Sequence, residues 1–583
     1  MRPSLPGRSR SSVPADTRPP APLSGTFVFL ALVLLLLHAW ILRGFLVDDA
    51  FISWRYARHL AEGLGPVFNP GERVEGFSNP LYTMLMGVVA WLVGIFGGGR
   101  DAVIAHLPGL GRAVGVAAAL GTIVAMARWR DVSRAPGTLL AVLLTATSTS
   151  LALWSVGGLE TTLYGFFLAA AFGATLAQPR TTMGRLGTGL LLAAVALSRP
   201  EGIVPAGALF LVRWLDPATR DERRGHLEVG LAFALPVLAW FLFRVTWFGD
   251  WLPNTYYAKK LGLAEAWRKG SWYLVSFVHH NGGRWLYAPA VLAFFDRPRR
   301  RLAWTAGFVL AAYIPYILFV GGDWMDQHRF LAPVVPFIYL LTGLGWGVLI
   351  ETGRRLLVLW PGEGRLVDVA VELGVLVAWC LLLRPTYDLT RAQVAGGGYV
   401  NARPYYETVG REISVLIGDG GRPGWRGLVW PHEGAPPVGS AATHDIGAIG
   451  WYGGVGIVDL LGLVDRDLAK GRVDAEELIA RERPDLVVLH YDNRSSDDPS
   501  RPRWRELEAH GLDTLYVPVA IHGYDGLPWL RVRSDREAEV RRRWEEVRTR
   551  ALASSIPSAA ERNDGGRRRS DRAPRTRGSE RLR

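Results

Sequence analysis

Two adjacent carboxylates, Asp48 and Asp49, closely follow the stretch Thr26–Leu42, which contains no Asp, Glu, Lys or Arg. Acidic side chains at the edge of a bilayer are unfavourable, because their charge is best solvated by water. A carboxylate in that place can act as a general base that takes the proton of an attacking hydroxyl group. It can also simply cap the start of a helix. The pair therefore indicates chemistry just outside a membrane span, with helix capping as the alternative.

The residues after this pair predict an amphipathic helix over 50–62. Arg55 and Arg58 fall on one narrow polar face of a helical wheel, and apolar side chains cover the opposite face. This pattern is typical of a helix that lies in the membrane interface. Asp49 is expected to cap the helix and Asp48 to be the base, although the reverse assignment stays open. The two arginines can hold phosphate or can meet lipid headgroups.

Further candidate residues lie in segments that are expected to be loops outside the membrane. Glu75, in a Gly-, Asn- and Pro-rich loop, can bind acceptor hydroxyls or can be a solvated loop acid. Lys259 can bind phosphate, or can extend its side chain to the membrane surface. Asp323, His328 and Arg329 gather just before an apolar run. This short cluster of acids and cations favours a binding site over the anchoring of a span.

Three charged residues occur beside apolar runs, where charges are functional by default. Arg199 and Glu201 can line a site or can form a structural salt bridge at a helix break, and Glu160 has the same two interpretations. His444 and Asp445 begin a Gly-rich stretch further along the chain. They can reach back to the acceptor, or they can form a turn.

The composition indicates what must position these residues. The chain has 583 residues, 49% of them hydrophobic, with 23 tryptophans and a mean hydropathy of +0.14. Apolar runs recur from Thr26 to Arg384, and most are about as long as a bilayer is thick. Arg-rich linkers between the runs predict the cytoplasmic side, so the acidic loops and the C-terminal part fall outside. A cytoplasmic N-terminus then requires an odd number of crossings, and roughly eleven are expected.

The predicted fold class is an α-helical multi-pass membrane protein with a C-terminal soluble α/β domain. The strands of that domain are expected in "GLVWP" (427–431), "PDLVVLHY" (484–491) and "TLYVPVAI" (514–521). The expected parts are a disordered cytoplasmic N-terminus (1–25), a transmembrane domain (26–385) with the first external loop (47–79), the soluble domain (386–543) and a disordered Arg-rich tail (551–583).

The net charge of +13 would fit a nucleic-acid-binding protein, but its distribution argues against one. Residues 1–25 contribute +3 and residues 561–583 contribute +5, and short clusters between apolar runs supply much of the rest. This pattern reflects membrane topology, not the recognition of a nucleic-acid groove. A single cysteine, Cys380, excludes a disulfide bond within the chain.

Several motifs, in order along the chain, resemble those of a bacterial group of GT-C glycosyltransferases. The group includes the terminal arabinofuranosyltransferases of mycobacterial cell walls and the ZomB-type flagellar motor control proteins. The resemblance runs from about residue 26 to 465. The motif of the first external loop and "GGDWMDQHRFLAP" are specific evidence for the resemblance. "GLETTLY" and "SRPEG" are weak evidence when taken alone. The matching stretches are "DDAFISWRYARHLAEGLGPVFNPGERVEGFSNPLYT" (48–83), "GLETTLY" (158–164), "SRPEG" (198–202), "LPNTYYAK" (252–259), "GGDWMDQHRFLAP" (321–333) and "HDIGAIGWYG" (444–453).

This resemblance implies a polyprenyl-phosphate sugar donor and an acidic base in the first external loop, here Asp48 or Asp49. It implies an active site on the outer face of the bacterial cytoplasmic membrane and a glycan, lipid or protein acceptor of the cell envelope. Asn254 is a further substrate-binding candidate within its "LPNTYYAK" motif. A single base predicts inversion at the sugar carbon, because retaining enzymes hold two carboxylates close together. "GLETT" departs from the more usual "GLETP", and arabinofuranose is a candidate sugar.

The metal requirement and two other functions stay open. Carboxylates beside phosphate suit Mg²⁺ or Mn²⁺, but no dedicated set of metal ligands is recognisable in the sequence. A transporter of lipid-linked substrates would also have charged residues at the ends of its spans. Here, however, the charged motifs gather in external loops, and charges in the middle of spans are few. A non-catalytic membrane assembly factor would keep the fold without needing the Asp pair. No nucleic-acid partner is expected. The lipid bilayer itself is an expected partner.

Overall fold

The computed structural model describes residues 25–129, 137–219, 221–259, 261–325, 327–356, 364–395, 403–418, 439–488, 511–512, 514–518 and 530–555. The predicted N-terminal tail, nearly all of the predicted C-terminal tail and the strand expected at 427–431 lie outside these residues.

The first two thirds of the chain form a bundle of helices. Apolar segments of this kind become helical because, in lipid, each backbone N–H and C=O must find its partner within the segment. Short 3-10 turns interrupt the bundle at η1 (Pro200–Gly202), η2 (Ala288–Phe294), η3 (Arg297–Arg299) and η4 (Ala332–Val334). The helices are α1 (Gly25–Ile41), α2 (Asp48–Ala61), α3 (Pro80–Gly97), α4 (Arg100–Arg128), α5 (Thr138–Ala146), α6 (Thr149–Val156), α7 (Thr161–Ala177), α8 (Thr182–Ser198), α9 (Ile203–Leu215), α10 (Arg223–Phe248), α11 (Asn254–Ala258), α12 (Leu263–His280), α13 (Arg284–Tyr287), α14 (Arg300–Val320), α15 (Val335–Leu356) and α16 (Gly364–Ala395).

Five helices in the described part are long and apolar enough to cross a membrane: α3, α4, α10, α14 extended by η3, and α15 extended by η4. The pair α5 and α6, bent by 43°, makes up to six, and α1, α7 and α8 are shorter apolar helices. The predicted class of a helical membrane protein is therefore confirmed. The expected count of about eleven crossings is not confirmed, because several expected segments form helices shorter than a membrane span.

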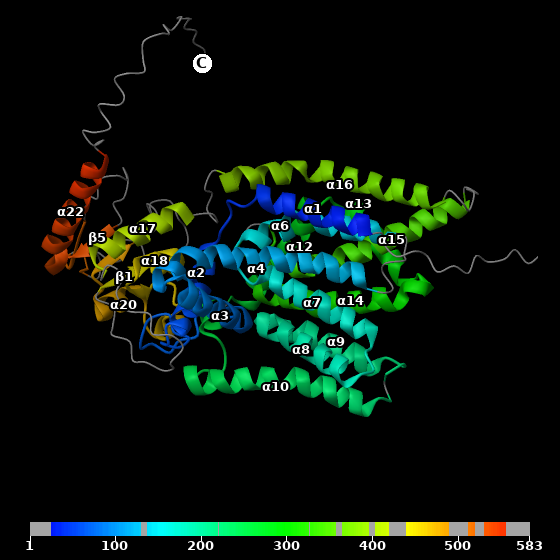
Figure 1. Cartoon of the computed structure of the whole chain (residues 1–583), viewed down its shortest axis with the longest axis horizontal. Helices are drawn as coiled ribbons and strands as arrows, with labels where there is room; N and C mark the ends of the chain where they lie inside the picture. Colours follow the sequence, from blue (N-terminus) through cyan, green and yellow to red (C-terminus); the bar gives the residue numbers. More distant parts are fainter. Residues whose placement is uncertain are drawn as a thin grey trace, which may run out of the picture.

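Helix α3 packs against α2. Asn79, just before α3, bonds to Ser53 of α2, and a Cβ at Gly87 would touch Leu60 of α2. Just after α3, the Arg100 side chain pairs with Glu62 at 3.6 Å. In Figure 1, both helices lie toward the end of the bundle that carries the C-terminal domain.

The C-terminal part sits at one end of the bundle and is built on a small mixed sheet (Figure 1). The strand order is β2-β1-β3-β5-β4, in which the first three strands are parallel and β5 is antiparallel to both of its neighbours. The register pairs Ala441 with Ile457 and with Leu486. The predicted α/β character is thus confirmed. The elements are α17 (Arg403–Leu416), β1 (Ser440–Thr443), α18 (Ile446–Gly453), β2 (Gly456–Asp459), α19 (Arg466–Ala469), α20 (Ala475–Glu482), β3 (Leu486–Val488), β4 (Tyr516–Pro518), β5 (Leu530–Arg533), η6 (Ser534–Arg536) and α22 (Glu537–Ser555).

One hydrophobic core runs through both parts of the molecule. Its buried side chains extend from Ala31 in α1 to Val540 in α22, and Trp54 and Trp451 are fully buried within it. A second, smaller cluster around Ala442, Val487 and Tyr516 belongs to the C-terminal domain alone. The C-terminal domain is therefore packed into the bundle and is not joined to it merely by a linker.

Helix α2 lies at the centre of this junction, which corrects two expectations. Residues Ala50–His59 are buried on every side, so the predicted interfacial helix with a lipid-facing side is wrong. The apolar face packs on the bundle, and the polar face, with Arg55 and Arg58, packs on the C-terminal domain. Asp49 does not cap α2 either, because the N-cap position is Val47 and no side chain makes a capping bond there.

Glycines of α18 permit its close approach to α2. A Cβ at Gly447 would lie 2.1 Å from the main-chain oxygen of Asp48, and a Cβ at Gly450 would lie 2.7 Å from Arg55 Nη1. The Gly-x-x-Gly spacing puts both positions on one face of the short helix. The motif "HDIGAIGWYG" thus forms a smooth surface that fits against the start of α2.

Gly447→Ala should therefore weaken the attachment of the C-terminal domain. Overpacking at a closed contact typically destabilises by about 1–3 kcal/mol, and here the clashing atom is backbone. The variant should show a lower melting temperature in detergent and faster proteolysis within the C-terminal domain. Gly262→Ala is the matched control, because a Cβ there would meet nothing within 4 Å. Equal melting temperatures for the two variants would contradict this account of the contact.

Candidate functional site

Asp48 and Asp49 occupy different environments although they are adjacent in the first turn of α2. Asp48 Oδ2 accepts a hydrogen bond from Gly447 N at 3.0 Å, and Asp48 Oδ1 accepts one from Ala448 N at 2.7 Å. These are orphan N–H groups of the first turn of α18, whose own N-cap residue, Asp445, makes no capping bond. Asp48 therefore caps a helix of the C-terminal domain across the junction. Burial and the nearby Asp445 carboxylate raise the pKa of Asp48, against the lowering effect of these two bonds.

Asp49 is left available for chemistry. Its side chain is half-buried, and within the described part of the chain it makes no hydrogen bond and no ion pair. The residue before the pair, Val47, donates from its backbone N to Gly157 O at 3.1 Å. The carboxylate thus starts a rigidly held helix beside the "GLETT" segment, and a base needs such a fixed position.

Arg55 and Arg58 bind backbone carbonyl groups of the C-terminal domain. Arg55 donates to Gly450 O and, at 2.7 Å, to Val455 O, and it also donates to Phe68 O at 2.8 Å. Arg58 donates to Trp451 O at 3.2 Å, and its guanidinium lies 4.9 Å from the centre of the Trp451 ring. Burial lowers the pKa of Arg58 to about 10, so it stays charged at neutral pH. These contacts favour domain attachment over the predicted phosphate role.

The sequence analysis missed Asn69, which completes the same attachment. Its Oδ1 accepts from Ile457 N at 3.0 Å, and its Nδ2 donates to Ile457 O at 2.8 Å, as a strand neighbour would. Asn69 Oδ1 also accepts from Arg55 Nη2 at 3.3 Å. The Asn-Pro pair in "VFNPGE" indicates a turn. The neighbouring residues do not indicate that the Asn69 amide bonds to a strand several hundred residues later in the chain.

The external segment after α10 forms a second attachment to the C-terminal domain. Asn254 Nδ2 lies within hydrogen-bond distance of three carbonyl groups, those of Gly462, Leu463 and Asp465, at 2.8–3.1 Å. Asp250 accepts Lys470 Nζ at 2.9 Å with both carboxylate oxygens. These contacts to backbone carbonyl groups explain Asn254 without a substrate, so its predicted substrate contact gains no support here.

Glu75 is held from the side of the membrane bundle. Its carboxylate forms a bidentate pair with Arg244 of α10, with Arg244 Nε at 2.6 Å and Nη2 at 3.1 Å. Burial raises the pKa of Glu75 to about 7, although Arg244 acts in the opposite direction. The predicted loop acid is thus a buried tie between the first loop and α10.

The three candidate charges beside apolar runs form one buried network. Arg199 donates to Glu160 Oε1 at 2.6 Å and also pairs with Glu201. Glu160 Oε2 accepts from Asn79 Nδ2 at 2.6 Å, and Asn79 bonds to Ser53 of α2. The network joins "GLETT", "SRPEG" and the first external loop. Two carboxylates surround one guanidinium, so this cluster has a net negative charge and is unsuited to hold a phosphate by itself.

The "GGDW" loop holds a buried arginine with a single ion-pair partner among the described residues. Arg329 Nε lies 2.5 Å from Asp323 Oδ2, and within the described chain Arg329 makes no other ion pair. Its guanidinium lies 5.2 Å from the Phe330 ring and 5.7 Å from the Trp154 ring. Arg199 lies over the other side of the cluster, 4.9 Å from the same Phe330 ring. The sequence offered Arg329 and Arg199 as separate candidates, and the structure places both guanidinium groups near one aromatic ring.

The remaining candidates are His328, in the same loop as Arg329, and His444, Asp445 and Lys259, in other segments. His328 Nε2 lies 2.8 Å from Ser276 Oγ of α12, and burial lowers the pKa of His328 to about 4. His444 is buried at the end of β1, next to Asp445, and Lys259 is exposed at the end of α11. Among the residues that the structure describes, no three His, Cys, Asp or Glu side chains are grouped so that they could hold a metal ion.

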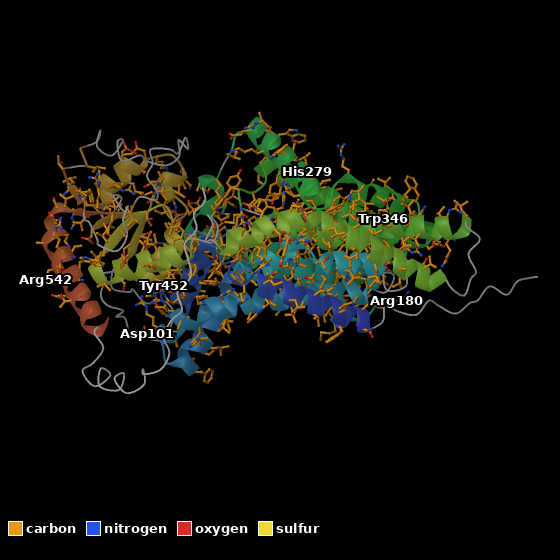
Figure 2. All side chains as sticks on the ribbon, turned by 90° about the horizontal axis from the view of Figure 1, so that it is seen from above. Asp101, Arg180, His279, Trp346, Tyr452 and Arg542 are labelled. Carbon is orange, nitrogen blue, oxygen red and sulfur yellow. The ribbon has the colours of Figure 1, made fainter. Side chains whose placement is uncertain are left out.

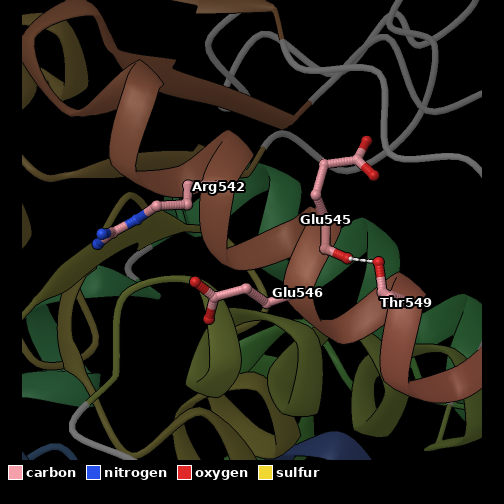
Figure 3. A pocket seen from close by; sticks show the side chains of 4 residues that line it. All are labelled: Arg542, Glu545, Glu546 and Thr549. Atoms are coloured by element: carbon pink, nitrogen blue, oxygen red, sulfur yellow. Dashed lines mark hydrogen bonds between the residues drawn. The ribbon is translucent and has the colours of Figure 1, made fainter.

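A shallow depression on α22 lies far from these residues. It has a volume of about 410 Å³ and is lined by Arg542, Glu545, Glu546 and Thr549 (Figure 3). In Figure 3, Thr549 Oγ1 donates along the helix to the backbone oxygen of Glu545, at 2.7 Å. Because it is open and borders one helix of the C-terminal domain, it takes no part in the candidate site.

Removing Arg199 should test the buried network. Arg199→Ala leaves the Glu160 and Glu201 carboxylates buried without their cation, and breaking a buried pair in this way typically destabilises by about 3–5 kcal/mol. The expected result is a large loss of thermal stability in detergent micelles. Arg224→Ala is the control, because Arg224 pairs with Glu228 at 3.0 Å but is 84% exposed. An exposed pair is worth about 0–1 kcal/mol, so similar losses in both variants would contradict the network.

Comparison with known proteins gives this geometry a context. A family model described as a domain of unknown function, DUF8728, matches residues 422–556, the C-terminal domain. A terminal β-(1→2)-arabinofuranosyltransferase of Mycobacterium tuberculosis is 28% identical over 265 residues. That match covers 43% of this chain and 40% of the relative, so less than half of the relative's length is represented.

The solved structures of ArnT from Cupriavidus metallidurans are similar in fold. The apo structure has a TM-score of 0.51 at 16% identity, and the match covers 87% of this chain and 97% of ArnT. The structure of the same protein bound to undecaprenyl phosphate has a TM-score of 0.50 over the same shares. The chain therefore has the GT-C fold, in agreement with the resemblance of its motifs.

Proposed function

We propose that this GT-C-fold membrane protein is a glycosyltransferase that moves a sugar from a polyprenyl phosphate to an acceptor of the cell envelope. The observation that carries the proposal is the unengaged carboxylate of Asp49 beside a neighbour, Asp48, that is fully used in capping α18. The donor class follows from ArnT, which was solved with undecaprenyl phosphate. Arabinofuranose is a candidate sugar, because the M. tuberculosis relative is an arabinofuranosyltransferase.

Asp49 is the base in this proposal, and Asp48 is a positioning residue. The acceptor hydroxyl attacks the anomeric carbon while Asp49 takes its proton, and the bond from that carbon to the phosphate oxygen breaks. The phosphate leaves with the bonding electrons as an anion, so no acid is needed to stabilise it. One base and one displacement give inversion. The sequence favoured Asp48 for this role and left the reverse open; the use of both Asp48 oxygens supports the reverse.

Arg329 is the residue that we assign to the donor phosphate. The other candidate arginines are engaged, since Arg55 and Arg58 bind carbonyl groups and Arg199 sits between two carboxylates. A guanidinium with free N–H groups binds phosphate through strong charge-assisted bonds. Phe330 and Trp154 hold its plane in place. Lys259, exposed at the end of α11, can supply a second charge.

Variants of the two aspartates should differ in their rates of sugar transfer. Asp49→Asn cannot accept a proton, and losing a general base typically reduces the rate on the order of 10²–10⁴-fold. Asp48→Asn keeps one acceptor for α18, so it should reduce transfer less than about tenfold while lowering stability by about 0.5–2 kcal/mol. The measurement is transfer of labelled sugar from polyprenyl phosphate by purified protein, with melting curves in parallel.

The same assay distinguishes the alternatives. A dead Asp48→Asn with an active Asp49→Asn would exchange the two roles. Wild-type transfer rates in both variants would refute the base. Absence of transfer by a folded wild-type protein with a range of polyprenyl sugars would favour a non-catalytic assembly factor, and movement of the intact donor across liposomes would favour a transporter.

The proposed site also requires a particular orientation in the membrane. We assign the side of the C-terminal domain to the outside, because the Arg-rich connection between α9 and α10 lies at the other end of the bundle (Figure 1). In Figure 2, Arg180 lies toward the end of the bundle opposite to Tyr452 of the C-terminal domain. With Cys380 replaced by Ser, Lys259→Cys should react with a membrane-impermeant maleimide in intact cells, and Arg180→Cys should react only after lysis. The opposite pattern would place the site in the cytoplasm.

A further inference from the structure

Helix α12 is amphipathic in a way that the membrane bundle does not require. It lies between the segment after α10 and the η2 turn, and it packs mainly on the outer end of α14. Three sides can be distinguished on its helical wheel. One is buried against protein, the next is exposed and apolar, and the third carries charged and histidine side chains.

The buried side of α12 holds the "GGDW" loop. Phe330 N donates to Tyr273 OH at 3.0 Å, and Ser276 Oγ lies 2.8 Å from His328 Nε2. A Cβ at Gly322 would lie 2.7 Å from the Tyr273 ring, so the loop backbone rests directly on the helix. Gly322 and His328 have positive φ values of 78° and 54°, a shape that needs support from its surroundings. Helix α12 provides that support.

The exposed apolar side is made of hydrophobic side chains that the described part of the protein leaves largely uncovered. Leu263 is 69% exposed, Trp267 is 59% exposed and Val275 is 60% exposed. At about 100° per residue these three fall within roughly a third of a turn of one another. The charged side, with Glu265, Lys269 and His279, is adjacent, and Trp272 lies among these polar residues. In Figure 2, His279 lies at the margin of the molecule.

Two observations identify what covers the apolar side. First, it adjoins an exposed apolar surface of the bundle. A Cβ at Gly270 of α12 would lie 2.8 Å from Leu318 Cα of α14; Phe319, the next residue of α14, is 59% exposed, and Trp324 in the following loop is 60% exposed. Second, tryptophans beside cations are the composition of a helix at the level of lipid headgroups, where the ring is half in hydrocarbon and the charge is in water. A soluble partner protein would not explain the continuity with the spans.

We propose that α12 lies in the outer headgroup layer of the bilayer, with Leu263, Trp267 and Val275 in lipid, and thereby fixes the depth of the "GGDW" loop. The interfacial helix that the sequence placed at 50–62 is thus assigned to 263–280 instead. The inference about depth is independent of chemistry. Its consequence for the donor rests on the proposed function, since a lipid-linked phosphate arrives in the plane of the headgroups and must meet Arg329 there.

The depth is measured with single cysteines in a Cys380→Ser background, in nanodiscs of phosphatidylethanolamine and phosphatidylglycerol. An environment-sensitive fluorophore on Val275→Cys should emit at short wavelength and be quenched by lipids that carry a nitroxide near the headgroup. The same fluorophore on Lys269→Cys, on the charged side of the same helix, should be quenched by iodide from water. Quenching of Val275→Cys by iodide and not by the nitroxide lipid would overturn the proposal, and so would protection from both quenchers.

A kinetic arm tests the link to the donor. The double variant Trp267→Ser/Val275→Ser should raise KM for a long-chain polyprenyl donor roughly tenfold, with little change in kcat. KM for a short-chain, water-soluble donor should not change, and Trp267→Phe/Val275→Leu should restore KM. Equal effects on both donors would overturn the link between α12 and donor capture. Failure of the proposed function would instead appear as no transfer by the wild type, with the fluorophore depth unaffected.

Discussion

The bonds from the Asp48 carboxylate to the backbone N–H groups of Gly447 and Ala448 connect the two parts of this protein. The short helix α18 has no effective cap of its own, so its start is completed by a residue almost four hundred positions earlier in the chain. Arg55, Arg58 and Asn69 extend the same contact to the carbonyl groups of α18 and β2. Because all these groups are buried, a separation of the domains would leave charges and backbone polar groups unsatisfied. The first external loop is therefore ordered by the C-terminal domain.

The folded structure also distinguishes candidate charged residues that already have partners from those that do not. Most of the acidic and basic residues that the sequence offers for chemistry are neutralised by one another or by backbone dipoles: Glu75 by Arg244, Arg199 by Glu160 and Glu201, and the arginines of α2 by carbonyl groups. Asp49, which makes no hydrogen bond or ion pair within the described residues, and Arg329, which pairs there with Asp323 alone, are the exceptions on which the proposed function rests. A charged side chain next to a membrane is thus better judged by counting its partners than by its position in a motif, because a satisfied charge has little left to offer a substrate.

Much of the architecture could be predicted from the sequence, because membrane helices follow from the length and apolarity of single segments. The helical class, the small α/β domain and the resemblance to GT-C glycosyltransferases all held. The errors share one cause. The helix predicted at 50–62 has two faces of different polarity. A helical wheel does not show whether the polar face contacts water, lipid headgroups or the backbone of another domain. The same ambiguity hid α12, whose tryptophans looked like any others in a chain with 23 of them.

The sequence by itself determined which chemical groups are present, that the chain is a helical membrane protein and which motifs it shares with a known fold. It also offered two adjacent aspartates as candidate bases. Only the tertiary structure showed that the two lie in different environments, because the distinction depends on Gly447 and Ala448, which lie far along the chain and carry no side-chain signal of their own role. A backbone N–H is present at nearly every position, and only the folded chain decides which one is left without a partner and which carboxylate reaches it.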